Sequence, residues 1–294
     1  MSRDVMCYNR FKVMKTNSDI RPSPLAGRWY PANPTQLAES VDRYIESANI
    51  PDFQGKVIAL ISPHAGHLYS GPVAGYCFKA IKDLQPDLVL ILSPYHAFHN
   101  SAILTTGHQA YQTPLGDVAV DQRIIDIIDE RLQERAGVGL YRVRNDEEHA
   151  IEILLPFFQR SLKKPFKVVP LMIRSQDPAL IKELGIILSE IMGEKKILLA
   201  ASSDLSHFFP ADKARDMDQV IIDQIIDLNP EGLFAIQHQG TGAACGIGAL
   251  AAVIWASRET GHVTAHHLHY ANSGDITGDK SSVVGYTSAV IIRD

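Results

Sequence analysis

The chain of 294 residues is long enough to bury one large hydrophobic core or two modest ones. Its net charge of −5 argues against a general nucleic-acid binder, because such a protein needs a basic patch that neutralises phosphates. No apolar run approaches the ~20 residues that cross a bilayer, which argues against a membrane partner. The N-terminus lacks the continuous apolar segment of a secretory signal, and three cysteines make no disulfide framework, so we expect a cytoplasmic protein.

In chain order, residues 1–20 are expected to form an N-terminal extension, either a tail or a short added strand. Asn33 or Thr35 can cap a helix that reaches about Ser47, because apolar residues recur four positions apart along it. Strands are then expected at 57–62, 87–92, 166–173, 196–201, 264–271 and 282–292. Further helices are expected at 73–84, 121–132, 150–163, 178–192 and 211–228, and from the small-residue loop 240–246 through residue 255. This alternation indicates one α/β domain, a three-layer α/β/α sandwich with a mixed, largely parallel sheet.

Three of the expected strands end in the same way, with serine and then histidine within a few residues. Strand 57–62 leads to His64, strand 87–92 leads to His96, and strand 196–201 leads to His207. The carboxyl ends of parallel strands carry the functional loops of α/β proteins. If these strands are parallel neighbours, we expect their loops to converge on one crevice.

Two of these histidines are candidate metal ligands. His64 and His96 follow separate strands by short turns, and imidazole is the commonest protein ligand for borderline transition metals. Cys245 is the candidate third ligand, because it lies in a glycine-rich turn at a helix start, where backbone N–H groups and the helix dipole should lower its thiol pKa. Two histidines and a cysteine suit iron, copper or zinc rather than magnesium. The alternatives are hydrogen-bonded structural histidines and a small cysteine packed under the helix.

His207 is a candidate general acid or base, because a histidine held by a carboxylate or carbonyl titrates near neutral pH, and Asp204 lies three residues before it. The serines of the same segment could instead only end the strand and cap the next helix. His149 could orient a ligand, or it could simply begin the helix at 150–163. The acidic residues at 146–148 suit that helix start through capping and the macrodipole.

Several motifs, in order from about residue 21 to the end, together resemble the Memo family. They are RPSPLAGRWYP, SPHAGHLYSGPVAG, SPYHAF, YQTPLGDVAVD, DEEHAIEILLPF, SSDLSHF, the Cys245-Gly246 turn and YANSGDITGDKSSVVGY. The resemblance implies a single Memo-like domain over residues 21–294. Prokaryotic members are often labelled AmmeMemoRadiSam system protein B, which implies a radical SAM protein as a partner. The family is similar in fold to the catalytic subunits of class III extradiol dioxygenases, which are non-haem iron enzymes.

The resemblance implies roles for particular residues. His64, His96 and Cys245 match the family's metal-binding positions, and His207, with Asp204 beside it, matches the catalytic base of the dioxygenases. The third ligand of those dioxygenases is a carboxylate, whereas a cysteine stands here. A thiolate makes the site softer, which favours copper or an iron of altered redox potential, with zinc a weaker candidate. This ligand also argues against ordinary ring cleavage.

Two hypotheses of function follow. The first is a metal-dependent oxidoreductase that uses iron or copper in redox or dioxygenase-like chemistry on an unknown substrate. The second is a non-catalytic accessory protein that binds a small molecule or a peptide in the same crevice. A zinc hydrolase is a third and weaker hypothesis.

Overall fold

The structure is a computed structural model that describes residues 19–294. The expected N-terminal extension therefore lies almost wholly outside the described residues. Its end at Ile20 belongs to β1 (Ile20–Arg21), which pairs with β5 (Ala110–Tyr111). With β6 (Val118–Ala119), these strands form a small separate sheet.

A nine-stranded mixed sheet forms the centre of the described part of the chain. Its order is β10 (His207–Phe209), β12 (Val283–Arg293), β2 (Lys56–Ser62), β9 (Ile197–Ser202), β3 (Leu88–Pro94), β8 (Lys167–Ile173), β4 (Ile103–Thr106) and β7 (Tyr141–Val143), with β11 (Val263–Asn272) paired to β12. The central strands β2, β9, β3 and β8 are parallel. The strands that flank them, β12 and β4, are antiparallel to their central neighbours.

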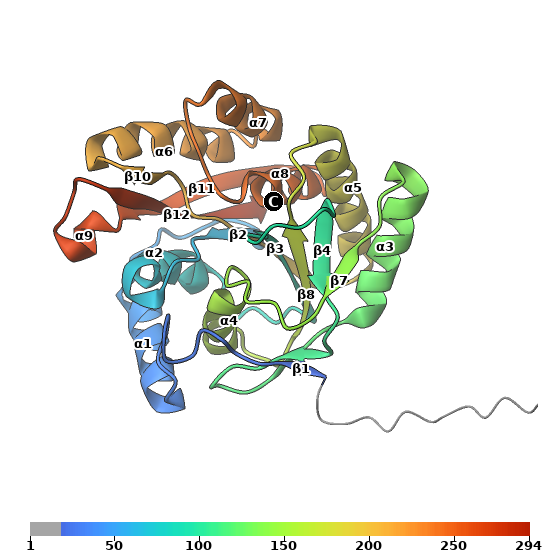
Figure 1. Ribbon diagram of the computed structural model, residues 1–294, viewed down its shortest axis with the longest axis horizontal. Coiled ribbons are helices and arrows are strands. Elements are labelled where there is room, and N and C mark those ends of the chain that lie inside the picture. Colours follow the sequence, from blue (N-terminus) through green and yellow to red (C-terminus); the bar gives the residue numbers. More distant parts are fainter. Residues whose placement is uncertain (1–18) are drawn as a thin grey trace, which may run out of the picture.

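Helices cover both faces of this sheet (Figure 1). One layer contains α1 (Pro34–Ser47), α2 (His67–Ala80) and α4 (Leu155–Ser161). The other contains α3 (Gln122–Ala136), α5 (Pro178–Glu194), α6 (Ala211–Ile226), α7 (Pro230–Gln239) and α8 (Ile247–Arg258). The expected three-layer α/β architecture with a mixed sheet is confirmed. Within residues 19–294, none of these helices combines the length and apolarity needed to pass through a bilayer.

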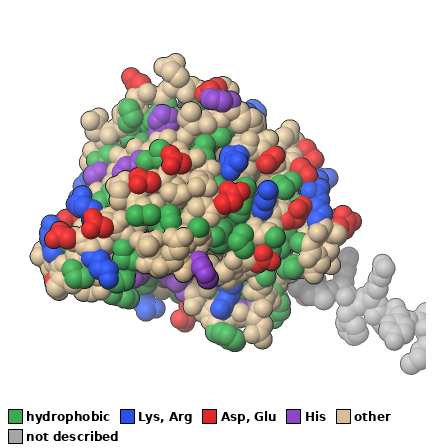
Figure 2. Space-filling model, turned by 90° about the horizontal axis from the view of Figure 1, so that it is seen from above, with side chains coloured by type: hydrophobic (Ala, Val, Ile, Leu, Met, Phe, Trp, Pro, Cys, Tyr) green, Lys and Arg blue, Asp and Glu red, His purple; other side chains and the backbone are tan. Residues whose placement is uncertain are grey.

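The central strands form because their residues are apolar on both faces, which suits a parallel sheet between two helical layers. All residues of β3 and β9 are buried, and so are all but the first of β2. The helix predicted to end at Ser47 also forms, with the Asn33 side chain accepting a hydrogen bond from the Gln36 N–H. The surface seen in Figure 2 carries acidic and basic side chains interspersed among apolar ones.

Three helices differ from the prediction. The helix expected at 150–163 is instead a 3-10 turn at Glu152–Leu154 followed by the short α4. Pro156 explains this start, because proline lacks an N–H and fits an α-helix best in its first turn. The helix α7 was not predicted, and α2 begins at His67, six residues before the expected start.

Candidate metal centre

The carboxyl ends of three neighbouring parallel strands meet at one edge of the sheet. The strands β2, β9 and β3 lie side by side in that order, paired in parallel. Their following loops carry His64, His207 and His96 respectively. The predicted convergence of these loops is therefore confirmed.

The His64 imidazole is oriented by a serine at the end of β9. The hydroxyl of Ser202 donates to the Ala150 carbonyl oxygen at 2.6 Å, so its lone pair is left to accept from His64 Nδ1 at 2.8 Å. This network assigns the proton to Nδ1 and leaves the His64 Nε2 lone pair free. The backbone N–H of His64 donates to Asp204 Oδ1 at 2.7 Å, which fixes the loop itself.

The His96 imidazole is oriented by Glu148, a buried carboxylate from a distant loop. The backbone N–H of His96 donates to Glu148 Oε2 at 2.6 Å, and Nδ1 lies 3.0 Å from Oε1. Burial raises the pKa of Glu148, but the hydrogen bond and charge of His96 outweigh burial and lower this pKa to about 2. Burial lowers the pKa of His96, but the hydrogen bond and charge of Glu148 outweigh it, so the pKa of His96 is raised. The carboxylate holds the proton on Nδ1, so Nε2 is the nitrogen that can lose its proton and bind a metal.

His149 joins these two residues in one cluster. A ligand atom from each of His64, His96 and His149 lies within 4.8 Å of the other two. The His149 ring stacks on His96 with 4.4 Å between centroids and contacts Trp29 at 4.5 Å. Burial lowers the pKa of His149 to about 4, which favours the neutral imidazole that binds metals. The sequence suggested only an orienting role or a helix start for this residue.

Cys245 lies beside the histidine cluster, immediately before α8. Its Sγ is 3.2 Å from His64 Nε2 and accepts the Asp204 N–H at 3.2 Å. Burial, followed by the charge of Asp204, raises the pKa of this thiol. The expected lowering of that pKa by the helix start is therefore wrong, because desolvation outweighs the helix dipole here.

His207 and Asp204 both face the same space, but they do not form a pair. His207 Nδ1 donates to the Leu205 carbonyl oxygen at 2.8 Å, so its Nε2 is free to accept a proton. Burial lowers the pKa of His207 and raises the pKa of Asp204 to about 7. The sequence suggested that either a carboxylate or a carbonyl holds His207, and in the structure it is the Leu205 carbonyl.

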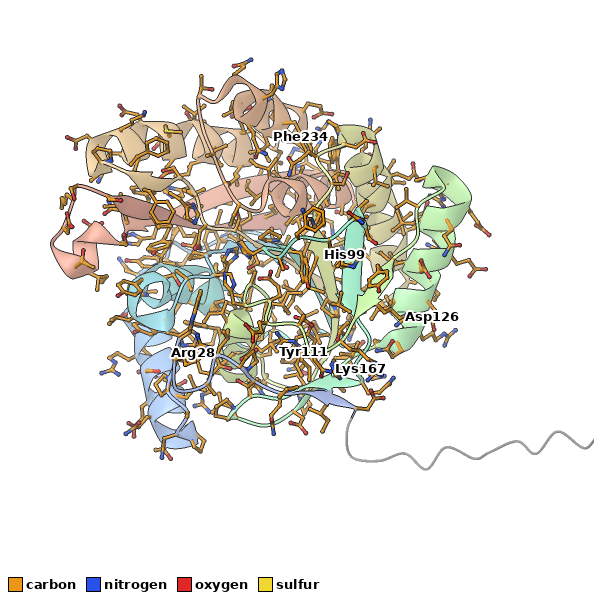
Figure 3. All side chains as sticks on the ribbon, in the orientation of Figure 1. Arg28, His99, Tyr111, Asp126, Lys167 and Phe234 are labelled. Carbon is orange, nitrogen blue, oxygen red and sulfur yellow. The ribbon has the colours of Figure 1, made fainter. Side chains whose placement is uncertain are left out.

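A cavity of about 520 Å³ opens over the cluster. Arg28, from the segment between β1 and α1 (Figure 3), is an exposed cation at its margin. The lining residues are Arg28, Trp29, His64, Ala65, Gly66, Leu68, Tyr69, His96, His149, Asp204, His207, Val284 and Tyr286. Such a mostly apolar pocket with a few convergent polar groups is typical of a small-molecule site.

A buried ionic network positions the loop that carries Glu148 and His149. Arg21 is only 1% exposed and donates to Glu152 Oε2 at 2.6 Å, to Asp146 Oδ1 at 3.1 Å and to the Glu148 carbonyl oxygen at 2.7 Å. The sequence pattern instead predicts that the acidic residues at 146–148 begin a helix. No local pattern marks this network, because its members come from segments more than a hundred residues apart.

Fold and site together define a three-layer α/β protein with a histidine-rich pocket at the carboxyl edge of its parallel strands. The model of the family described as Memo-like protein matches residues 21–290. A MEMO1 family protein of Sulfolobus acidocaldarius is 35% identical over 92% of this chain and 98% of its own length. One from Methanocaldococcus jannaschii is 33% identical over 92% and 99%. The chain belongs to the Memo-like family.

A solved structure shares the fold at a greater distance. It is that of uncharacterized protein JW3007 from Escherichia coli K12, with a TM-score of 0.54 and 17% sequence identity. The match covers 81% of this chain and all of the other. At this identity the likeness concerns the fold alone.

Proposed function

We propose that this protein is a metal-dependent oxidoreductase that holds iron or copper through His64, His96 and Cys245. Its substrate is a small molecule bound in the cavity above them. The observation that carries the proposal is the position of Cys245 Sγ, 3.2 Å from Nε2 of His64, whose ring is anchored through Nδ1.

The donor set fits a transition metal. His64 and His96 each have Nδ1 bonded to an oxygen, which leaves Nε2 available to a metal. His149 offers a further imidazole within 4.8 Å of both. Cys245 would hold the ion as a thiolate, because the thiolate is the form that binds metals. Imidazole and thiolate donors favour iron, copper or zinc over magnesium, and bound iron or copper supplies one-electron chemistry with oxygen.

The protein's own residues would bind the substrate and move protons. His207 has a free Nε2 facing the cavity, where it can accept a proton from a substrate hydroxyl or return one. Asp204 positions the His64 loop through the backbone N–H of that residue. Trp29 and Tyr286 line the cavity and offer aromatic surface to a substrate.

Metal analysis of protein prepared without oxygen tests the proposal. Wild type should take up one equivalent of iron or copper, and Cys245→Ser should lose at least roughly tenfold in affinity together with any thiolate-to-metal charge-transfer band. Cys77→Ser is the matched control, because Cys77 is a free thiol buried in α2. A wild-type protein that binds neither metal, or a Cys245→Ser spectrum identical to wild type, would refute the assignment.

A second candidate is a non-catalytic protein that binds a small molecule or a peptide in the same cavity. The predominantly apolar lining and the exposed Arg28 favour it, because they can hold a ligand without any metal. In this role the protein would serve a modifying enzyme, for which the radical SAM protein implied by the family resemblance is the candidate. Ligand affinity that survives both a chelator and His207→Ala would support this function over the oxidoreductase.

A further inference from the structure

The bulge in β10 places a phenylalanine in a backbone conformation that favours glycine. His207 pairs with Val284, and Phe209 pairs with Val283, so Phe208 is the extra residue of the bulge. Its φ is +66°, the left-handed region in which a Cβ is disfavoured. Bulges of this kind usually have glycine at the left-handed position, and bulges next to active sites re-aim side chains.

Burial of the Phe208 side chain does not offset the energetic cost of this backbone conformation. Its side chain is 75% exposed, so the ring gains little from the protein interior. Leu228 provides the contrast, because it also has a positive φ, of +51°, but packs against the hydrophobic core. Residues held in such strained conformations cluster at ligand clamps and active sites.

We define an apolar rim of the cavity as Leu68 and Tyr69, which line it, together with Phe208, which adjoins it through His207. Leu68 is 62% exposed and Tyr69 is 39% exposed, and both line the cavity. The ring of Phe208 meets the ring of His207 edge to face, with 5.6 Å between centroids, and His207 lines the cavity. Exposed apolar groups gathered at one place mark a binding surface, and this one is continuous with the pocket over the histidine cluster.

We propose that Phe208 is a specificity-determining residue that packs on the apolar end of a substrate extending out of the cavity. The substrate would therefore have a polar head at the histidine cluster and an apolar body that passes the rim. Continuity of the rim with the cavity favours this occupant over a separate macromolecule. The inference rests on the proposed function in placing the substrate in this cavity.

Calorimetric titration with butanoate, octanoate and dodecanoate tests the inference. In wild type the affinity should rise with chain length once the chain reaches the rim, since each buried methylene contributes about fourfold. In Phe208→Gly the affinity for the two longer chains should fall roughly tenfold while butanoate is unchanged. Phe208→Leu keeps an apolar side chain and should restore part of the gain.

The matched control is Leu228→Gly, which relieves a left-handed residue away from the cavity and should leave all three affinities as in wild type. Phe208→Gly should melt at or above the wild-type temperature, because glycine accepts this φ and little buried surface is lost. Equal affinities for wild type and Phe208→Gly with every alkanoate, or no dependence on chain length, would overturn the inference.

Two further outcomes would assign the rim to another occupant and would also overturn it. One is wild-type binding to phosphatidylglycerol vesicles that Phe208→Gly abolishes, without any change in alkanoate affinity. The other is a wild-type dimer in sedimentation that Phe208→Gly converts to a monomer. Metal content is measured in parallel, so that a failure of the proposed function is seen separately. Wild-type protein without metal can still bind longer alkanoates more tightly, and Phe208→Gly can still lose this effect.

Discussion

Three histidines of the cavity share one arrangement, in which Nδ1 is bonded to an oxygen and Nε2 has no oxygen partner among the described residues. The oxygen comes from Ser202 for His64, from Glu148 for His96 and from the Leu205 carbonyl for His207. A fixed Nδ1 sets both the tautomer and the plane of the ring. Neighbouring residues, rather than the histidines themselves, thus determine the direction in which each Nε2 points.

Replacing Glu148 should weaken the candidate metal site without removing a ligand. Glu148→Gln loses the carboxylate that holds His96 Nδ1 and its backbone N–H, so metal affinity should fall by roughly 10- to 100-fold. Competition titration against a chromophoric chelator measures the change. The neighbouring Glu147 is exposed, so Glu147→Gln should bind as wild type does, and equal losses in the two variants would contradict the role of Glu148.

The sequence predicts part of this site, and the reason is local. His64 and His96 stand just beyond buried strands, so their position at the sheet edge follows from the strand pattern alone. His149 and Glu148 depend on a loop held by the ion pair of Arg21 with Glu152, whose partners are 131 residues apart in the chain. A contact between residues so far apart cannot be predicted from patterns of neighbouring residues.

At the scale of elements, the approach of α8 to the end of β9 brings Cys245 to the histidines. Gly246 makes this approach feasible, because a Cβ there would lie 2.6 Å from the Ser202 carbonyl oxygen and 2.7 Å from the Ser203 side chain. The backbone N–H of Gly246 also donates to Ser203 Oγ at 2.9 Å. The first turn of α8 therefore depends on a residue without a side chain.

We expect Gly246→Ala to push the start of α8 away from β9. Overpacking of this kind costs about 1–3 kcal/mol of folding free energy, and displacement of Cys245 should weaken metal binding as well. Denaturant unfolding and metal titration measure the two effects. Gly193→Ala is the control: its added Cβ meets nothing within 4 Å in α5, so stability should stay the same or rise by up to about 1 kcal/mol. An unaltered Gly246→Ala protein would contradict the packing argument.

Most elements could be predicted from the sequence, and the exceptions have identifiable causes. The strands β2, β3 and β9 follow from continuous apolar runs, and α1 follows from its cap and periodicity. The missed α7 did carry signals, with Asn229 capping its start, Pro230 in its first turn and Gly240 in the left-handed conformation at its end. Its weak apolar periodicity hid them.

At the scale of the whole molecule, a buried histidine makes stability depend on pH. His67 begins α2, and its Nε2 donates to the Ile153 carbonyl oxygen at 2.9 Å. The His67 ring contacts the rings of Tyr30 and Phe157, and burial lowers the pKa of His67 to about 4. Between about pH 6.5 and 4 the unfolded chain therefore binds the proton that the folded protein excludes.

This difference should lower stability as the pH falls through that window, by up to roughly 3 kcal/mol for the one group. His67→Gln removes the titrating group, so its unfolding free energy should vary less between pH 6.5 and 4 than that of wild type. Urea unfolding across this range measures the slope. His238 is exposed at the end of α7, and His238→Gln should keep the wild-type slope. Parallel curves for wild type and His67→Gln would refute the assignment.

The strand β12 pairs with β2 on one side and β11 on the other, although residues 283–293 come last in the described chain. A nascent polypeptide on the ribosome therefore cannot close its sheet until residue 293 has emerged from the exit tunnel. Until then the edge of β2 that β12 will cover has no partner from β12, and unpaired apolar strand edges invite association with other chains. A folding intermediate that lacks β12 should therefore associate with other chains more readily than the complete sheet does.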